Sequence, residues 1–255
     1  MTTMRGRRRL ALLVHPRDIL ASRSKRNAVA QALHTRVLDL VQLRATESDG
    51  DEDVLSAGTA LALLVKERAE QPSLSTSSTR LVVNHSSLEM ALAIGTSGWH
   101  LKERLVVGRP AREVRRDVES AKSNNVMVGC SVHSVEAALQ ASVCGFDYIQ
   151  VGTMFSTASH PEKSHSSLLE GPNLLRRIRA VRDAGDSTAA LWPPLIAVGG
   201  IYTKDHVAEV MEAGADGVAV IRGILADTNP EEAARSYRTW LDNWSSSPEI
   251  SKHNG

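Results

Sequence analysis

The sequence has few aromatic residues, only two cysteines and almost no net charge. Aromatic residues make up 4% of its 255 residues, so its core must be aliphatic. Cys130 and Cys144 are too few for a disulfide framework or a four-cysteine zinc site, which indicates a reducing, cytoplasmic setting. The net charge of +1 provides no overall field that would draw nucleic acid or an anionic membrane to the chain. No apolar run approaches about 18 residues, so no membrane span is expected.

Polar segments mark both ends of the chain and two internal positions. Residues 1–9 form a short basic N-terminus that we expect to be flexible, with a remnant of an organelle-targeting signal left open. Residues 245–255 are polar and are expected to form a flexible tail. Residues 47–53 are acidic, and residues 70–79 are rich in Ser and Thr. Both internal segments are expected to be surface insertions or mobile loops.

Short aliphatic runs alternate with longer amphipathic segments between these ends. The runs lack the polar alternation of a half-exposed strand, which suits strands that are buried on both faces of a parallel sheet. The runs cover residues 10–14, 38–43, 81–83, 98–101, 126–129, 148–151, 195–198 and 217–220. Helical spacing of apolar residues and capping residues predict helices over residues 87–94, 134–143, 203–211 and 230–244.

Strands that alternate with helices indicate βα units, and the sequence offers eight of them. Eight parallel strands close into a barrel, and roughly 250 residues is a typical length for one. The sequence therefore predicts an α/β fold, a single (β/α)8 TIM barrel over residues 10–244. A doubly wound sheet is the alternative that the same pattern allows.

Polar side chains and imidazoles follow the predicted strands at the end where barrel enzymes place their active sites. This ring includes no carboxylate and predicts no metal site, since hard cations need oxygen ligands. His85 and His100 lie 15 residues apart and match no local metal-binding motif. The ring contains His15, Gln42, Arg44, Asn84, His85, His100, Ser131, His133 and Thr153.

Glycines follow the last two predicted strands. Gly199 and Gly200 come directly after residues 195–198, and Ile221, Arg222 and Gly223 follow residues 217–220. The loops after strands seven and eight of a barrel often bind phosphate through backbone N–H groups and the start of a short helix. These five residues are therefore predicted to bind phosphate, and tight turns without a ligand are the alternative.

His133 stands just before the helix that Ser134 is predicted to cap. The positive end of a helix dipole disfavours the imidazolium and helps to keep the ring neutral near pH 7. A neutral imidazole can accept a proton and then return it. His133 is thus the candidate general acid/base, and a histidine that only packs beside the helix is the alternative.

A series of motifs in a fixed order resembles the thiamine phosphate synthase / TenI superfamily, whose fold is a (β/α)8 barrel. The resemblance covers roughly residues 10–244 and is much more specific as a full series than in any single motif. The motifs are Gln42-Leu43-Arg44, Leu81 to Asn84, Gly98 to Leu101, Gly129 to Ser134, Asp147 to Thr157, Ile196 to Ile201 and Ala213 to Val220.

One branch of that superfamily, thiamine phosphate synthase, joins a hydroxymethylpyrimidine diphosphate to a thiazole phosphate and releases diphosphate with Mg²⁺. Its pattern has one lysine and two aspartates at positions that carry Thr46, His85 and Leu105 here. Its lysine in the loop after strand six aligns best with His160, close to Lys163. The missing carboxylates and lysine argue against the synthase reaction, since a diphosphate–Mg²⁺ site needs carboxylate oxygens and cations.

The other branch, thiazole tautomerase, aromatises a thiazole phosphate carboxylate by moving a proton without a metal. The resemblance places its general acid/base on His133 and keeps the phosphate loops, although Arg222 replaces the usual small hydroxyl residue. We therefore expect a tautomerase-like isomerase that needs no cofactor and acts on a small phosphorylated thiazole. Its substrate is expected to contact Gln42, Arg44, Asn84, Ser131 and Thr153.

Two alternatives remain open. A thiamine phosphate synthase would need Mg²⁺ and a diphosphate site rebuilt from Arg44, His85, His160 and Lys163. A non-catalytic barrel would bind a thiamine precursor or a partner and regulate, as the absence of carboxylates suggests. The sequence also leaves a homo-oligomer open.

Overall fold

The computed structural model describes residues 7–69, 79–157, 169–184 and 192–244. Eight parallel strands form a closed barrel in which each strand pairs with its neighbours along the chain and β8 pairs with β1. The predicted (β/α)8 barrel is confirmed. The strands are β1 (Arg9–Val14), β2 (Leu40–Arg44), β3 (Arg80–Asn84), β4 (Gly98–Leu101), β5 (Met127–Val132), β6 (Tyr148–Val151), β7 (Leu195–Val198) and β8 (Gly217–Val220).

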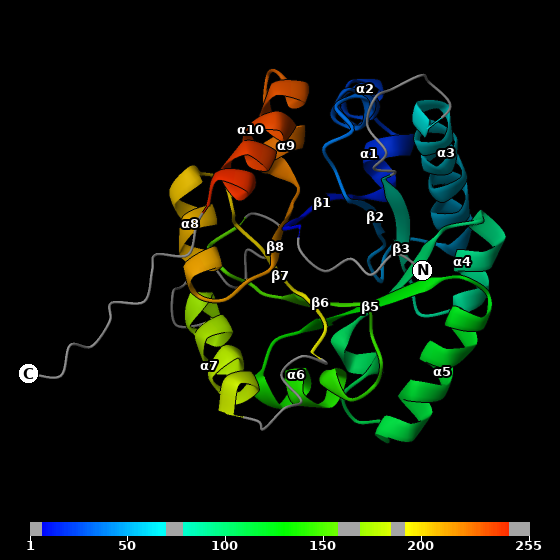
Figure 1. Ribbon diagram of the computed structural model, residues 1–255. Helices are drawn as coiled ribbons and strands as arrows, with labels where there is room; N and C mark the ends of the chain where they lie inside the picture. Colours follow the sequence, from blue (N-terminus) through cyan, green and yellow to red (C-terminus); the bar gives the residue numbers. More distant parts are fainter. Residues whose placement is uncertain (1–6, 70–78, 158–168, 185–191, 245–255) are drawn as a thin grey trace, which may run out of the picture.

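Helices surround the strands on the outside of the barrel (Figure 1). The four predicted helices correspond to α4, α6, α8 and α10, and Ser134 caps α6 by accepting a hydrogen bond from the backbone N–H of Ala137. The helices are α1 (Pro16–Leu20), α2 (Arg23–His34), α3 (Asp51–Ala69), α4 (Leu88–Ile94), α5 (Ala111–Ser123), α6 (Val135–Ser142), α7 (Gly171–Ala184), α8 (Lys204–Glu212), α9 (Arg222–Leu225) and α10 (Pro230–Asn243), with a short 3₁₀ helix, η1 (Glu103–Leu105).

One predicted loop is wrong in part. Residues 47–53 were expected to be a surface insertion, but Asp51, Glu52 and Asp53 form the first turn of α3. Acidic side chains are favoured there because they face the positive end of the helix dipole. The segments 70–78, 158–168, 185–191 and 245–255 and residues 1–6 lie outside the described residues, so the expectations for the tail and most of the Ser/Thr-rich segment stay predictions.

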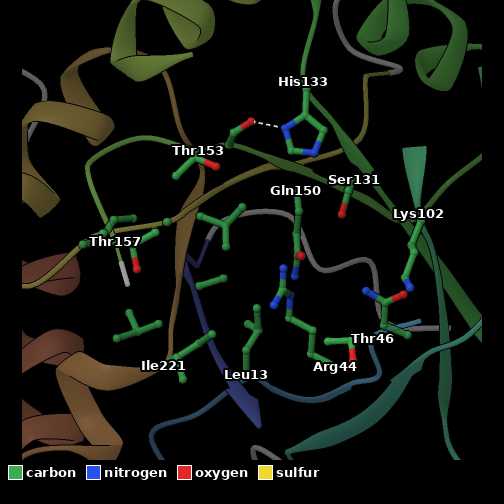
Figure 2. Close-up of a pocket in the computed structure, with 18 of the residues that line it drawn as sticks. Leu13, Arg44, Thr46, Lys102, Ser131, His133, Gln150, Thr153, Thr157 and Ile221 are labelled. Atoms are coloured by element: carbon green, nitrogen blue, oxygen red, sulfur yellow. Dashed lines mark hydrogen bonds between the residues drawn. The ribbon is translucent and has the colours of Figure 1, made fainter. Parts of the chain in front are cut away.

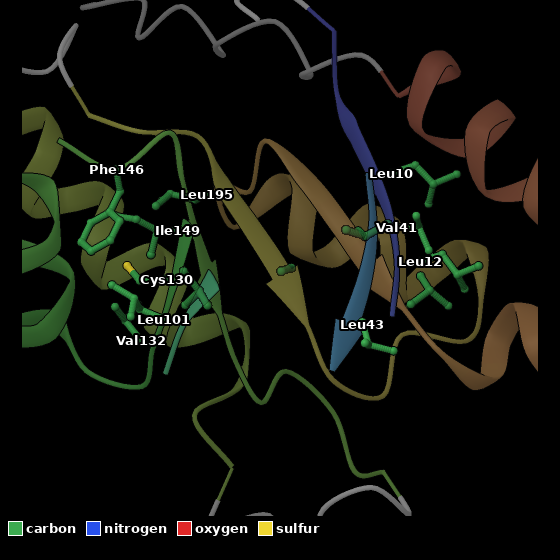
Figure 3. Close-up of a cluster of buried hydrophobic side chains, with 14 of the residues drawn as sticks. Leu10, Leu12, Val41, Leu43, Leu101, Cys130, Val132, Phe146, Ile149 and Leu195 are labelled. Carbon is green, nitrogen blue, oxygen red and sulfur yellow. The ribbon is translucent and has the colours of Figure 1, made fainter. Parts of the chain in front are cut away.

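The core has two layers because the side chains of each strand alternate between the inside of the barrel and the helices. In β1, Leu10 and Leu12 belong to the large cluster between strands and helices, whereas Ala11 and Leu13 belong to the cluster inside the barrel. Figure 3 shows the outer layer, where Leu10, Leu12, Val41 and Leu43 lie on one side of the barrel and Leu101, Cys130, Val132, Phe146, Ile149 and Leu195 lie on another.

The carboxyl ends of all eight strands meet at one end of the barrel, where the loops that carry most of the predicted site residues emerge. In the part of the chain that the structure describes, no helix combines the length and apolar character that a membrane span would need.

Candidate active site

A cavity of ≈ 410 Å³ opens at the carboxyl ends of the strands (Figure 2). Of the residues that were predicted to act in catalysis, substrate binding or phosphate binding, all but two line it. The two exceptions are Gln42, which lies buried below, and Gly223, which is absent from the lining. The predicted residues that line the cavity are Arg44, Asn84, Ser131, His133, Thr153, Gly199, Gly200, Ile221 and Arg222.

The glycines after β7 have left-handed backbone conformations, with φ of 101° at Gly199 and 67° at Gly200. A Cβ on Gly200 would clash with the carbonyl oxygen of Phe155, which is rigid backbone. Glycine is therefore required where this loop packs against the loop after β6. The backbone N–H of Phe155 donates to the carbonyl of Gly199 at 3.0 Å, which joins the two loops.

Arg222 begins the short helix α9 after β8 and lines the cavity together with Ile221. Gly223 has a packing role instead, since a Cβ there would clash with the hydroxyl oxygen of Tyr237. We call Gly199, Gly200, Ile221 and Arg222 the β7–β8 rim.

His133 follows the end of β5 and is fixed by three groups. Its Nδ1 donates to the carbonyl oxygen of Gly152 at 2.5 Å (Figure 2), so this nitrogen carries a proton. Nδ1 also lies 3.3 Å from Oε1 of Glu170, whose Oε2 accepts the backbone N–H of Thr153 at 2.5 Å. The backbone N–H of His133 donates to Oε1 of Glu103 at 2.8 Å. The ring is therefore held in one orientation at the cavity wall.

A buried polar network forms the floor of the cavity. Nε2 of His100 lies 2.8 Å from the hydroxyl of Ser131, and Nδ1 lies 3.0 Å from the hydroxyl of Tyr148. Burial is the main reason that the pKa of His100 falls to about 3, and Arg44 lowers it further. The imidazole is neutral at pH 7, with one nitrogen donating and the other accepting. Tyr148 fits inside the barrel because Gly129 has no side chain to clash with its ring.

Two glutamines extend this floor. Nε2 of Gln42 lies 3.5 Å from the Tyr148 hydroxyl, and Nε2 of Gln150 donates to Oε1 of Gln42 at 3.4 Å. Gln150 lines the cavity, whereas Gln42 is 1% exposed. Gln42 is thus placed behind Gln150.

The opposite side of the cavity is formed by cations. Arg44 ends β2, Lys102 follows β4 and Arg104 lies in η1, and all three line the cavity. We call these three residues the β2–β4 rim. Burial lowers the pKa of Lys102, and its Coulombic neighbours include Glu47, which raises the pKa, and Arg104 and Arg44, which lower it.

Three expectations about the ring of strand-end residues are wrong. Carboxylates are present, because Glu47 and Glu103 line the cavity and Glu170 holds His133. His85 is absent from the cavity lining, and its Nε2 lies 3.2 Å from Asp51 at the start of α3. His15 is also outside the cavity lining and is the N-cap residue of α1, where its backbone N–H donates to Asp18.

Some of the missed residues had a signal in the sequence. Lys102 and Glu103 are the first and second residues after a correctly predicted strand, so including two residues past that strand end would have found them. Glu170 has no such signal, because it reaches Thr153 and His133 from beyond residues 158–168. His160 and Lys163 lie in that segment, outside the described residues.

The donor atoms at the cavity do not suit a divalent metal ion. The described part of the chain contains no group of three or more His, Cys, Asp or Glu side chains that could hold one. An oxygen of Glu47 lies 3.2 Å from the Arg104 guanidinium, and Oε1 of Glu103 accepts the His133 N–H. Asn84 offers one buried oxygen without a partner, in a wall that also carries Arg44 and Lys102. Neighbouring cations repel a dication.

A closed barrel whose carboxyl end holds a cavity with polar and charged side chains in its wall defines a (β/α)8 barrel with a small-molecule site. Within that class, the chain belongs to the family described as thiamine monophosphate synthase (TMP-TENI), whose model matches residues 10–224.

Named relatives agree with this family. A thiamine-phosphate synthase from Natronomonas pharaonis is 37% identical over 218 residues, which cover 84% of this chain and 86% of that protein. One from Methanoculleus marisnigri is 34% identical over 200 residues, or 78% of this chain and 80% of that protein. A solved thiamine phosphate pyrophosphorylase from Pyrococcus furiosus, with 24% identity and a TM-score of 0.65, covers 92% of this chain and 95% of its own and supports the fold.

These relatives overturn the expected tautomerase-like isomerase. Curated relatives that are 29–37% identical to this chain are named thiamine-phosphate synthase, so the prediction of an isomerase was wrong. The error came from treating the absence of aspartates at two positions as the loss of the synthase reaction, although the cavity wall contains other charged groups.

Proposed function

We propose that this protein is a thiamine-phosphate synthase that joins a hydroxymethylpyrimidine diphosphate to a thiazole phosphate and releases diphosphate. Its relatives of that name support the proposal. The structural observation that supports it best is a single cavity with two different rims, one of glycine backbone and one of cationic side chains. A reaction that joins two anionic substrates needs a separate anion-binding region for each of them within one cavity.

The thiazole phosphate is assigned to the β7–β8 rim. Gly199 and Gly200 let the backbone approach phosphate oxygens closely, and Arg222 adds a positive charge. Loop packing alone would also explain these glycines. The assignment of phosphate to this rim therefore depends on the glycines and the positive charge of Arg222 lying at the same part of the cavity.

The pyrimidine diphosphate is assigned to the other side of the cavity. Arg44 faces its negative charge, while Asn84, Ser131, Gln150 and Thr153 offer hydrogen-bonding groups for a polar ring and for phosphate oxygens. Gln42 contributes from behind by orienting Gln150.

Charge distribution explains how this arrangement would assist the coupling. The diphosphate leaves with the electron pair of the broken C–O bond, so its negative charge grows in the transition state as the bond to the thiazole nitrogen forms. Fixed cations at the cavity wall stabilise that charge without reorganising. His133 holds its place between the rims through Gly152 and Glu170, and we assign it contact with the reacting groups rather than proton transfer.

Mg²⁺ is the cofactor that the family resemblance implies for a synthase. The described residues do not form a carboxylate site for it. No step of the proposed reaction is therefore assigned to a metal. The effect of Mg²⁺ on the activity is determined by experiment.

The test is a coupling assay on the full chain with both substrates, with Mg²⁺ and with EDTA. Product is identified as thiamine phosphate by mass, and released diphosphate is measured in the same samples. Equal amounts of the two products are expected. Binding of the substrates without either product would contradict the proposal and favour a non-catalytic barrel.

A further inference from the structure

The three side chains of the β2–β4 rim come from the carboxyl ends of two strands that are separated by β3. Arg44 lies at the end of β2, and Lys102 and Arg104 follow β4. Figure 2 shows the Arg44 side chain in the middle of the cavity, beside Gln150, and the Lys102 side chain entering from one edge. Burial is the main cause that lowers the pKa of Lys102, and its charged neighbours are Glu47 and Asp49, which raise the pKa, and Arg104 and Arg44, which lower it.

The ammonium group of Lys102 has no hydrogen-bond or ion-pair partner among residues 7–69, 79–157, 169–184 and 192–244, for which interactions are described. Burial also lowers its pKa, so the charged form is held in a less favourable environment than water. A cation that is partly desolvated next to other cations is stabilised when an anion arrives.

Glu47 pairs with Arg104, and Glu47 and Asp49 attract Lys102, but the Lys102 ammonium keeps no ion-pair partner among the described residues. Glu47 lies 3.2 Å from Arg104, and Oε1 of Glu103 is engaged by the backbone N–H of His133. The side-chain oxygen of Asn84 is buried in the same wall without a partner among the described residues, and as an acceptor it needs an N–H or O–H donor from the rest of the substrate or from ordered water, not a diphosphate oxygen.

We propose that the β2–β4 rim binds the diphosphate of the pyrimidine substrate directly, with Lys102 as a ligand of its oxygens, and that this binding needs no metal ion. This inference rests on the proposed synthase function for the identity of the ligand.

The chemistry of the three side chains fits a diphosphate. A guanidinium presents a planar set of donors that can bind two phosphate oxygens at once, and an ammonium acts as a compact point charge. A diphosphate carries several negative charges over two adjacent phosphoryl groups, so cations from two loops can share it. The same positive charges would oppose a Mg²⁺ ion that is not already bound to the diphosphate.

The test is calorimetric titration of inorganic diphosphate into the full chain in EDTA and, separately, in excess Mg²⁺. Three variants are compared with the unchanged chain. Lys102→Gln removes the ammonium, Lys102→Arg keeps the charge, and Arg116→Gln removes one charge from the exposed surface of α5, away from the cavity lining. Thermal unfolding of each variant verifies that it is folded.

We expect the unchanged chain to bind diphosphate in EDTA. Loss of one charge-assisted interaction is expected to weaken that binding about tenfold in Lys102→Gln. Lys102→Arg should recover most of the affinity, and Arg116→Gln should change it less than about twofold, because exposed charges far from a ligand are screened.

Two results would overturn the inference. Binding that occurs only with Mg²⁺ would show that a metal is required, and equal affinities for Lys102→Gln and Arg116→Gln would remove Lys102 from the site. The coupling assay separates this outcome from failure of the proposed function. Metal-free diphosphate binding without thiamine phosphate formation contradicts the function alone, whereas product formation with strictly Mg²⁺-dependent diphosphate binding contradicts the inference alone.

Discussion

The two rims of the cavity use different parts of the protein chain, backbone in one and charged side chains in the other. The β7–β8 rim depends on backbone, with glycines at positive φ that hold two loops together. The β2–β4 rim depends on the ends of long side chains, Arg44, Lys102 and Arg104. A backbone rim can accept few residue types, whereas a side-chain rim can change its residues while the strands stay in place. A substitution in the first rim therefore disturbs the loops themselves, whereas a substitution in the second changes the charge of the cavity wall.

Breaking the backbone rim should have the largest effect. Gly200→Ala places a Cβ against the Phe155 carbonyl oxygen at a positive φ, so the loops must shift. We expect kcat/KM for thiamine phosphate formation to fall about a hundredfold, because small displacements of a binding site are costly. Gly50→Ala is the matched control, since a Cβ added there would meet nothing within 4 Å. Equal activity of the two variants would show that the β7–β8 rim is not needed.

The floor between the rims predicts a pH effect on stability. His100 has a pKa of about 3 in the folded protein against an ordinary 6.5, so below pH 6.5 the unfolded chain binds a proton that the folded chain refuses. Stability should therefore fall with decreasing pH, and this residue should contribute a loss of about 2 kcal/mol between pH 6.5 and pH 5.

Urea unfolding at several pH values tests this effect. His100→Gln should remove that part of the slope, whatever its effect on stability at pH 7. His15→Asn provides a comparison, because burial also lowers the pKa of His15 and its contribution has the same sign. An unchanged slope in His100→Gln would mean that His100 is not a buried neutral group.

Between the floor and the cationic rim, Ser131 offers a smaller effect. Its hydroxyl is held by His100 at 2.8 Å and lines the cavity. Ser131→Ala should lower kcat/KM about tenfold, since it removes one oriented hydrogen bond to the substrate. Ser142→Ala, which removes a hydroxyl that bonds only locally at the end of α6, is the control. If both variants keep full activity, the hydroxyl makes no contact with the substrate.

The smallest effect is expected where the cationic rim meets solvent. Arg104 and Glu47 form a pair whose side chains are 58% and 74% exposed, so the pair contributes little to stability. Glu47→Gln should free Arg104 and tighten diphosphate binding by at most about threefold, measured by the same titration. Glu119→Gln on the exposed face of α5 controls for the change in net charge. Weaker binding in Glu47→Gln would show that this carboxylate assists the ligand.

Local patterns were sufficient to predict the architecture. The bounds of β4, β6, β7 and β8 match their aliphatic runs, because fully buried parallel strands leave a short, continuous apolar segment. β5 was expected to end at Gly129 but continues to Val132, since Ser131 pairs with Gln150 and Val132 with Val151. A polar residue at the cavity face interrupts the apolar run without ending the strand.

The site could be predicted only where its residues stand next to strand ends. Arg44, Asn84 and Gly199 were found in this way, and Lys102 was missed by one position. Contacts such as those of Glu170 with His133, and of Tyr148 with His100, depend on how loops and strands from distant parts of the chain meet. The absence of the expected aspartates was given too much weight as an argument against the synthase reaction. Charged side chains that follow other strands also reach the cavity.

Simultaneous binding of two anions tests the division of the cavity most directly. The thiazole phosphate is titrated into the full chain already saturated with inorganic diphosphate, and its affinity is compared with that for the chain alone. Two separate rims predict that both ligands bind together, with an affinity for the thiazole phosphate that is retained or increased. Competition, in which each ligand displaces the other, would show that the two rims form one anion site and would contradict the proposed arrangement of the substrates.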